Sequence, residues 1–538
     1  MRFDFSTLSK PTLDRKPLFA CNGVVATSQH LASQAGLAAL KQGGNAVDAA
    51  LAAAITLTIV EQSSCDVGGD LFALVWDGSM LHGLNGSGRA PAGLTPEEVR
   101  RRGYDTMPEQ GWLSVTVPGV PAAWGDLHQR FGKLPFAELF APAIEYAEKG
   151  HPVSPTVFWN LSWGIEVIHA ELQGEEYRGF AEVFAPGGHV PQIGEVWRNP
   201  DLAETLRRLA QSHAQDFYTG EIAQKIAAFS ADTGGVLTLS DLQAHRSTWV
   251  EPISTTYRGY EVWELPPNGQ GLAALIALNI LEGFDLSTYP RESAESYHVQ
   301  IEAMKLAFVE AQRYVADPER VSVPTRELLS KEFAARRRAL IGEQALLPEP
   351  SEKLTSDTVY LCAADADGMM VSLIQSNSDT FGSHVVVPGT GMALQNRAAG
   401  FSLDPMHLNC LEPGKRPFHT IIPGFLTCDG QAIGPFGVMG GHMQPQGHVQ
   451  MMVNMLDYGL NPQASLDAPR WFWGEERWVQ VEPTVAPAIV EALRERGHEM
   501  NVDDEIDFVG RGQIIWRLPS GVYVAGSEPR ADGCALGY

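Results

Sequence analysis

The stretch SDTVYLCAADADGMMVSLIQSNSDTFG, Ser356 to Gly382, has the pattern of a β-hairpin. Apolar residues alternate from Val359 to Ala363, the turn DADG follows, and MMVSLIQS forms the returning strand. An Asp-Gly turn between two such runs is a strong local signal for a hairpin. The hairpin therefore marks the point where the chain becomes β-rich, and Thr358 stands just before its first strand.

The composition describes an acidic globular protein. The chain has 538 residues, of which 44% are hydrophobic and 19% charged, so it can form two or three domains or one large α/β fold. Its formal net charge of −25 argues against a nucleic-acid partner, because neutralising phosphates needs a basic face.

Three further features predict a cytoplasmic protein without a membrane partner. The six cysteines are scattered and make no CxxC pair, which favours a reducing compartment. The beginning, MRFDFSTLSKPTLDRKP, carries charges throughout and no apolar signal core. The longest apolar run, residues 46–60, contains Asp48 and is too short to span a bilayer.

Ahead of the hairpin the pattern is mainly helical. Residues 31–42 and the run after Asn45 predict two alanine-rich helices that pack closely, with Gly43-Gly44 as the stop between them. Asn45 is a good cap for the second helix.

Other segments predict further elements. Residues 136–149 and 221–228 predict helices, and residues 297–315 carry an apolar stripe at steps of four and three that indicates a core-facing helix. WLSVTVPGVPAAW, residues 112–124, predicts a strand that runs into a Pro/Gly turn. Residues 319–357 are charged and predict a solvated helix and a flexible connector, where a chain could be cut.

Taken in order, these fragments resemble the γ-glutamyltransferase family of N-terminal-nucleophile hydrolases. The resemblance rests on LASQAGLAALKQGGNAVDAALA, FYTGEIAQKIA, GGVLTLSDL, YRGYEVWELPPNGQG, DADG, TFGS, LQN, GFS, KRP, MGGH and GSEPRADGCALGY. It implies an α+β fold of the αββα type, in which helices flank two stacked antiparallel sheets. It also implies no cofactor and no metal.

The family cuts its own precursor in front of a threonine, which here points to the bond between Asp357 and Thr358. The expected products are residues 1–357, the large subunit, and 358–538, the small subunit, which form one composite domain as a heterodimer and can dimerise further. The cut exposes an α-amino group with a reference pKa of about 7.7–8.0, so nucleophile and base lie on one residue.

The resemblance also implies further catalytic groups. Gly440 and Gly441 match the glycine pair whose backbone N–H groups form the oxyanion hole, and donors of this kind stabilise the transition state. Ser376 matches a threonine whose hydroxyl supports the nucleophile.

The substrate pocket departs from the family pattern. Where the family has an acidic residue for the substrate ammonium, this chain has Gly400, and nearby Arg397 replaces a neutral amide. The predicted substrate-binding residues are Arg89, Ser378, Arg397, His419 and Thr420. Arg89 lies two positions from the register of the family's carboxylate-binding arginine. This set suits a carboxylate without a neighbouring ammonium, because guanidinium groups bind carboxylates in a bidentate manner.

The expected function is hydrolysis or transfer of a γ-glutamyl or similar carboxylate-bearing acyl group, from a small-molecule amide to water or an amine. The broad class is a glutathione hydrolase-like enzyme. Oxamate amidohydrolases and cephalosporin (glutaryl) acylases are alternatives, and an uncleaved binding protein is the non-catalytic one. His442 and His448 do not have zinc-ligand spacing, and the chain has no GxSxG or GxxxxGK[ST] motif.

Overall fold

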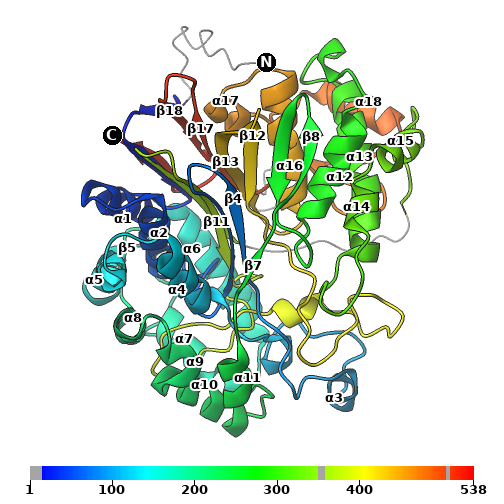
Figure 1. Ribbon diagram of the computed structural model, residues 1–538. Coiled ribbons are helices and arrows are strands. Elements are labelled where there is room, and N and C mark those ends of the chain that lie inside the picture. Colours follow the sequence, from blue (N-terminus) through cyan, green and yellow to red (C-terminus); the bar gives the residue numbers. More distant parts are fainter. Residues whose placement is uncertain (1–14, 349–357, 504–508) are drawn as a thin grey trace.

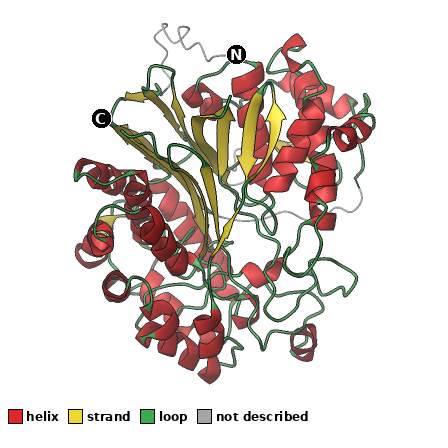
Figure 2. Cartoon of the chain, viewed as in Figure 1, coloured by secondary structure: helices red, strands yellow, loops and turns green. Residues whose placement is uncertain are grey.

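Two seven-stranded sheets lie face to face at the centre of the molecule (Figures 1 and 2). The computed structural model describes residues 15–348, 358–503 and 509–538. The first sheet has the strand order β1-β18-β17-β13-β12-β9-β8, and the second has the order β19-β2-β10-β11-β3-β4-β7. All neighbouring strands in both sheets are antiparallel.

The strands of the first sheet are β1 (Leu18–Ala20), β8 (Ile253–Tyr257), β9 (Tyr260–Glu264), β12 (Gly424–Cys428), β13 (Gln431–Met439), β17 (Arg511–Arg517) and β18 (Tyr523–Ser527). Those of the second are β2 (Gly23–Thr27), β3 (Asp70–Trp76), β4 (Leu81–Gly86), β7 (Thr248–Val250), β10 (Val359–Asp365), β11 (Met370–Ser376) and β19 (Cys534–Gly537). Short strands form two small sheets: β5 (His151–Pro152), β6 (Val196–Trp197), β14 (Trp471–Trp473), β15 (Trp478–Val481) and β16 (Glu499–Val502).

Helices cover both outer faces of the sandwich. In Figure 1 α1 and α2 lie beside the second sheet, while α12, α13 and α16 lie beside the first. The apolar core accordingly has three layers. One cluster joins α2 to the second sheet, one joins α12 and α13 to the first, and a third fills the space between the sheets. The αββα architecture expected from the sequence is therefore confirmed.

The helices before the hairpin are α1 (His30–Lys41), α2 (Ala46–Val60), α3 (Pro96–Arg101), α4 (Val120–Phe131), α5 (Ala141–Lys149), α6 (Pro155–Ser162), α7 (Arg178–Phe184), α8 (Pro200–Ser212), α9 (Asp216–Thr219), α10 (Glu221–Asp232), α11 (Leu239–Ala244), α12 (Gly271–Leu281), α13 (Ala294–Tyr314), α14 (Thr325–Leu328) and α15 (Lys331–Arg338). Those after it are α16 (Met443–Met452), α17 (Pro462–Asp467) and α18 (Pro487–Glu495).

The predicted helix pair forms as α1 and α2. Gly43 has φ = 93°, a left-handed conformation that ends α1, and Asn45 caps α2 through the backbone N–H groups of Val47 and Asp48. All of α2 is buried between the second sheet and its neighbouring helices, which explains its alanine-rich sequence.

At two places the structure differs from the elements predicted from the sequence. The helix expected at 136–149 is a 3₁₀ turn at Phe136–Phe140 followed by α5, because Pro142 has no N–H to donate and therefore suits only a helix's first turn. The strand expected at the start of 112–124 is wrong. This segment forms a 3₁₀ turn and a buried loop that leads into α4, and its backbone bonds other loops instead of a strand ladder.

The hairpin forms as β10 and β11 at the middle of the second sheet. Gly368 in its turn has φ = 91°, and Val359 pairs with Gln375. This register brings Thr358 and Ser376 to the same end of the hairpin. On the other side of β11, Ser376 pairs with Asp70 at the start of β3.

Candidate active site

Thr358 lies immediately before β10, and its side chain is fully buried. Its Oγ1 lies 3.1 Å from Oγ of Ser376, within hydrogen-bond distance. Ser376 Oγ also accepts a hydrogen bond from the backbone N–H of Ser378 at 2.8 Å. The predicted nucleophile and its predicted supporting hydroxyl are therefore in contact. Asp357, on the other side of the expected cut, lies outside the described residues.

Gly440 and Gly441 connect β13 of the first sheet to α16. Their φ values of 113° and 53° lie in the left-handed half of the map, which glycine adopts readily. Met439, at the end of β13, belongs to the apolar cluster between the sheets that also contains Tyr360 of β10. The glycine turn therefore begins where the two sheets meet, at the N-terminal end of a ten-residue helix whose dipole favours negative charge.

Gln270 ties this turn to the predicted substrate pocket. Its Nε2 donates to the carbonyl of Gly441 at 2.8 Å and to that of Thr420 at 2.5 Å. Gln270 is fully buried, just before α12. The sequence analysis did not single it out, although it lies within the quoted fragment YRGYEVWELPPNGQG.

Arg397 is an almost completely buried cation. Its side chain donates from Nη1 to Oγ1 of Thr420 at 2.6 Å. Within the described part of the chain, Nε and Nη2 have no hydrogen-bond partner. Burial lowers the pKa of Arg397 to about 10, against the opposing charges of Asp70 and Asp379. A guanidinium at that pKa remains protonated near neutral pH, so two charged N–H donors are available.

His419 lies next to this arginine, but its ring is already engaged. Nε2 lies 3.1 Å from Oδ2 of Asp70, and Nδ1 lies 3.4 Å from the backbone N–H of Ile421. Burial, followed by the charges of Arg397 and Arg416, holds the pKa of His419 well below its ordinary value. The neutral ring therefore donates from Nε2 to Asp70, and this N–H is not available to a substrate.

Arg89 is committed to other partners. It pairs with Asp317 at 3.3 Å and Glu319 at 2.8 Å and donates to the carbonyl of Gly414 at 3.1 Å. The structure therefore brings Arg397, His419 and Thr420 together and places Ser378 beside Ser376, whereas Arg89 belongs to a separate ion-pair network.

Asp70 is the charged residue of this region that the sequence analysis missed. Its carboxylate is fully buried and accepts hydrogen bonds from the backbone N–H groups of Gly88 and Gly119 as well as from His419. Burial raises the pKa of Asp70 to about 7, although the charge of Arg397 and these backbone bonds act against it. A signal was present in the sequence, because Asp70 interrupts the otherwise apolar run VGGDLFALVW.

The histidines that the sequence analysis considered for zinc have separate partners. His448 Nδ1 lies 2.6 Å from Glu264, while the ring of His442 stacks on Phe418 at 5.8 Å between centroids.

A different group of possible ligands is formed by His298, Glu302 and His498, whose ligand atoms all lie within 4.8 Å of one another. The ammonium of Lys305 lies 2.8 Å from Glu302, and both side chains are fully buried. An internal cation therefore already balances this carboxylate.

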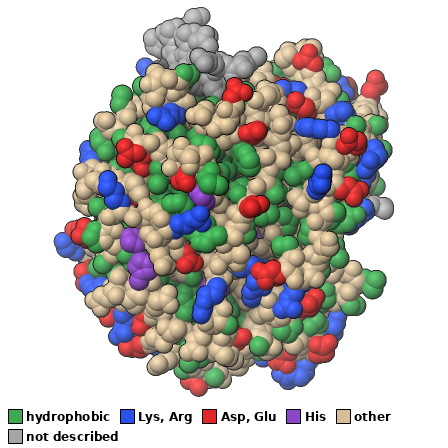
Figure 3. All heavy atoms as spheres, in the orientation of Figure 1, with side chains coloured by type: hydrophobic (Ala, Val, Ile, Leu, Met, Phe, Trp, Pro, Cys, Tyr) green, Lys and Arg blue, Asp and Glu red, His purple; other side chains and the backbone are tan. Residues whose placement is uncertain are grey.

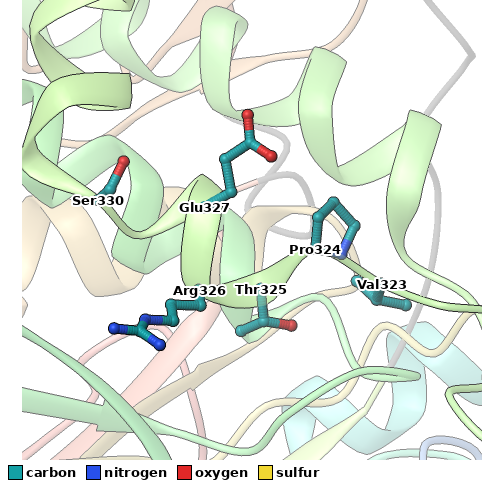
Figure 4. Close-up of a pocket in the computed structure, with 6 residues that line it drawn as sticks. All are labelled: Val323, Pro324, Thr325, Arg326, Glu327 and Ser330. Carbon is teal, nitrogen blue, oxygen red and sulfur yellow. The ribbon is translucent and has the colours of Figure 1, made fainter.

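The surface features lie elsewhere. An open depression of about 610 Å³ lies around α14 and includes none of the predicted site residues. Val323–Glu327 and Ser330 line it (Figure 4). Acidic and basic side chains are interspersed over the face shown in Figure 3. No helix within the described ranges is long and apolar enough to cross a membrane.

Comparison with known proteins places this geometry in a family. The model of the gamma-glutamyltranspeptidase family matches residues 32–538. The chain is 36% identical to the glutathione hydrolase-like YwrD proenzyme of Bacillus subtilis, covering 97% of this chain and 99% of that one. It is 35% identical to the oxamate amidohydrolase proenzyme of Klebsiella pneumoniae, covering 96% and 98%.

The fold is also that of a solved acylase. The structure of cephalosporin acylase from Bacillus halodurans superposes with a TM-score of 0.95 at 54% sequence identity, covering 100% of this chain and 99% of that one. Both the sequence and the fold therefore agree that the chain belongs to the gamma-glutamyltranspeptidase family.

Proposed function

We propose that this protein is a self-processing amidohydrolase or acyltransferase whose nucleophile is Thr358. The observation that carries the proposal is the buried contact of 3.1 Å between Thr358 Oγ1 and Ser376 Oγ, immediately before a central strand. The relatives named as proenzymes support a cut of the precursor. Cleavage between Asp357 and Thr358 gives two chains that stay together, because the hairpin of the small subunit pairs with β2 and β3 of the large one.

The chemistry follows from the groups that cleavage creates. The free amino group of Thr358 takes the proton from Oγ1 as this oxygen attacks the amide carbonyl. Backbone N–H groups of Gly440 and Gly441 stabilise the oxyanion, and the C–N bond then breaks as the amine leaves with the proton. The ester on Thr358 next passes its acyl group to water, or to an amine, and the threonine is regenerated.

The acyl group carries a carboxylate that Arg397 binds. Two N–H donors of this buried guanidinium have no partner in the described part of the chain, and Thr420 holds a third in place. A charge-assisted hydrogen bond in such a site contributes roughly 1.5–3 kcal/mol. Gly400 is exposed and cannot hold a substrate ammonium, which favours a glutaryl-like or oxamate-like acyl group. The names of two relatives, oxamate amidohydrolase and cephalosporin acylase, point the same way.

A γ-glutamyl donor is the second candidate, because one relative is named glutathione hydrolase-like. A γ-glutamyl donor has the same distal amide and carboxylate as a glutaryl donor, and it differs by its additional ammonium group. A kinetic panel of γ-glutamyl-anilide, glutaryl-anilide and oxamate separates the candidates. A clear preference for the γ-glutamyl compound would contradict the reading of Arg397 as the anchor of a carboxylate without an ammonium.

Intact mass under denaturing conditions tests the nucleophile itself. The parent should give chains of 357 and 181 residues, and Thr358→Ala should give one uncut chain. Thr256→Ala, at an exposed position of β8, is the matched control and should process normally. A parent that stays uncut at neutral pH would remove the catalytic base, and an uncleaved binding protein would then be the better interpretation.

A further inference from the structure

Asp70 connects the two halves of the candidate site. Its backbone pairs with Ser376, the residue that contacts Thr358, and its side chain reaches the ring of His419 on the substrate side. Its Oδ1 accepts from Gly88 at 3.2 Å and from Gly119 at 3.0 Å, so that two loops fix the carboxylate.

The two loops pack closely against each other's backbone. A Cβ atom at Gly119 would lie 1.6 Å from the carbonyl oxygen of Gly86, and one at Gly88 would lie 1.6 Å from that of Val117. Both positions therefore require glycine, and the two backbone N–H groups remain directed at Asp70. Asparagine could accept the same two bonds, so these contacts do not explain a charged residue.

The charge is explained by Arg397. In the absence of substrate, no carboxylate of the described residues is hydrogen-bonded to the guanidinium, and Asp70 and Asp379 balance it through space. When a substrate carboxylate binds, the same cation faces one anion more. Burying an additional, poorly balanced negative charge is costly unless one of the anions is neutralised.

We propose that Asp70 is a positioning residue that orients His419 and balances Arg397 in the empty site, and that it takes up a proton from the solvent when the substrate carboxylate binds. The bound carboxylate thereby replaces the charge of Asp70 next to Arg397. This inference rests on the proposed function, because it requires an anionic ligand at that guanidinium.

Compared with the groups that face it, Asp70 is the one expected to change its protonation near neutral pH. Burial lowers the pKa of Arg397 only to about 10 and also lowers that of Arg416, whose guanidinium, like that of Arg397, stays cationic near neutral pH. The pKa of His419 lies well below its ordinary value, and burial raises the pKa of Tyr218 well above its own. The pKa of Asp70, raised by burial to about 7, lies between these limits. The amino group of cleaved Thr358 also titrates near this range, so a variant of Asp70 is needed to separate the two.

Calorimetry with glutarate measures the proton directly. Glutarate binding to the mature two-chain protein is followed slightly above neutral pH, in two buffers that differ in ionisation enthalpy. On binding, the parent should take up about one proton more per site than Asp70→Asn, because one titrating group is removed in the variant. The affinity of Asp70→Asn for glutarate should also change less with pH. Asp77→Asn, which removes a carboxylate just beyond the far end of β3, is the matched control and should keep the proton uptake. If Asp70 has only a structural role, Asp70→Asn should be less stable than the parent and should take up the same number of protons on binding.

A second measurement does not need a variant. Infrared difference spectra of the parent with carbon-13-labelled glutarate should show a new protein band of a protonated carboxylic acid on binding. Equal proton uptake in parent and Asp70→Asn, or the absence of that band, would overturn the role of Asp70 and leave the carboxylate anchor standing. If glutarate does not bind the parent, both the anchor and the role of Asp70 fail. The processing and acylation of Thr358, measured by mass, would not be affected by that result.

Discussion

Two arginines, Arg397 and Arg470, are both almost completely buried, but their surroundings differ. Arg470 donates to Glu528 at 2.6 Å and to three backbone carbonyls, so its guanidinium is held on several sides. Arg397 donates to Thr420 and has two donors without a partner in the described part of the chain. A buried charge is expensive unless it is paired. The paired arginine is therefore explained by the fold, and the incompletely paired one is explained by a ligand.

The largest effect on stability is expected at the paired arginine. Arg470→Met removes the cation and leaves the carboxylate of Glu528 buried, and breaking such a pair costs about 3–5 kcal/mol. Urea unfolding of the parent and the variant measures this free energy. The double variant Arg470→Met/Glu528→Gln should recover a large part of it, because the uncompensated charge is then gone. A loss below about 1 kcal/mol in the single variant would show that Arg530, which also contacts Glu528, replaces the missing charge.

The two buried carboxylates next to these arginines are Asp70 and Glu528. Their contributions to the free energy of unfolding should depend on pH with opposite sign. Burial raises the pKa of Asp70 to about 7, above its unfolded value, so the ionised form is disfavoured by folding and stability is lost as pH rises from about 4 to 7. Although burial acts against it, Arg470 and Arg530 hold the pKa of Glu528 below its ordinary value, so its contribution is present above the unfolded pKa and is lost as pH falls through the folded pKa.

Unfolding free energies measured against pH compare the two. At pH 8 Asp70→Asn should be more stable than the parent by roughly 2–4 kcal/mol, and near pH 4 the two should be similar. Glu528→Gln should be less stable than the parent at pH 8, with a smaller difference in acid. Parallel curves for Asp70→Asn and the parent would mean that Asp70 does not change its protonation in this range. A carboxylate that lowers stability at neutral pH is expected where function, and not folding, requires it.

The sequence predicted the elements that depend on local patterns. The hairpin and the helix pair around Asn45 have local causes, namely alternation and capping, and the structure has them. The glycine pair Gly440 and Gly441 and the support of Thr358 by Ser376 were expected from the family resemblance, and the register of the hairpin accounts for the contact of these two side chains.

The parts that were missed depend on distant segments. Asp70 acquires its role from glycines and a histidine that are far away in sequence. The start of 112–124 was predicted as a strand because its apolar pattern does not reveal which loops its backbone bonds. The side chain of Arg89 could not be placed from its motif, because its partners Asp317 and Glu319 come from a remote loop.

The incompletely paired arginine should matter for activity more than for stability. Arg397→Met removes the proposed anchor, and kcat/KM for glutaryl-anilide should fall about 10- to 100-fold, which corresponds to roughly 1.5–3 kcal/mol. Butyryl-anilide, which lacks the carboxylate, is the matched substrate and should be turned over with little change. Equal losses on both substrates would show that Arg397 shapes the site as a whole. The unfolding free energy should change less than in Arg470→Met, since among the residues that the structure describes no carboxylate is hydrogen-bonded to Arg397.

The smallest effect is expected at Arg89, although its motif made it a candidate for the same carboxylate. Its guanidinium is shared between Asp317 and Glu319, and its side chain is 30% exposed. Because these carboxylates already hold the guanidinium, Arg89→Gln should change KM for glutaryl-anilide by less than about threefold, which corresponds to below about 1 kcal/mol. Initial-rate kinetics beside Arg397→Met provide the comparison. A loss as large as that of Arg397→Met, confined to the carboxylate substrate, would mean that Arg89 leaves its ion pairs when the substrate binds, and that the anchor consists of two arginines instead of one.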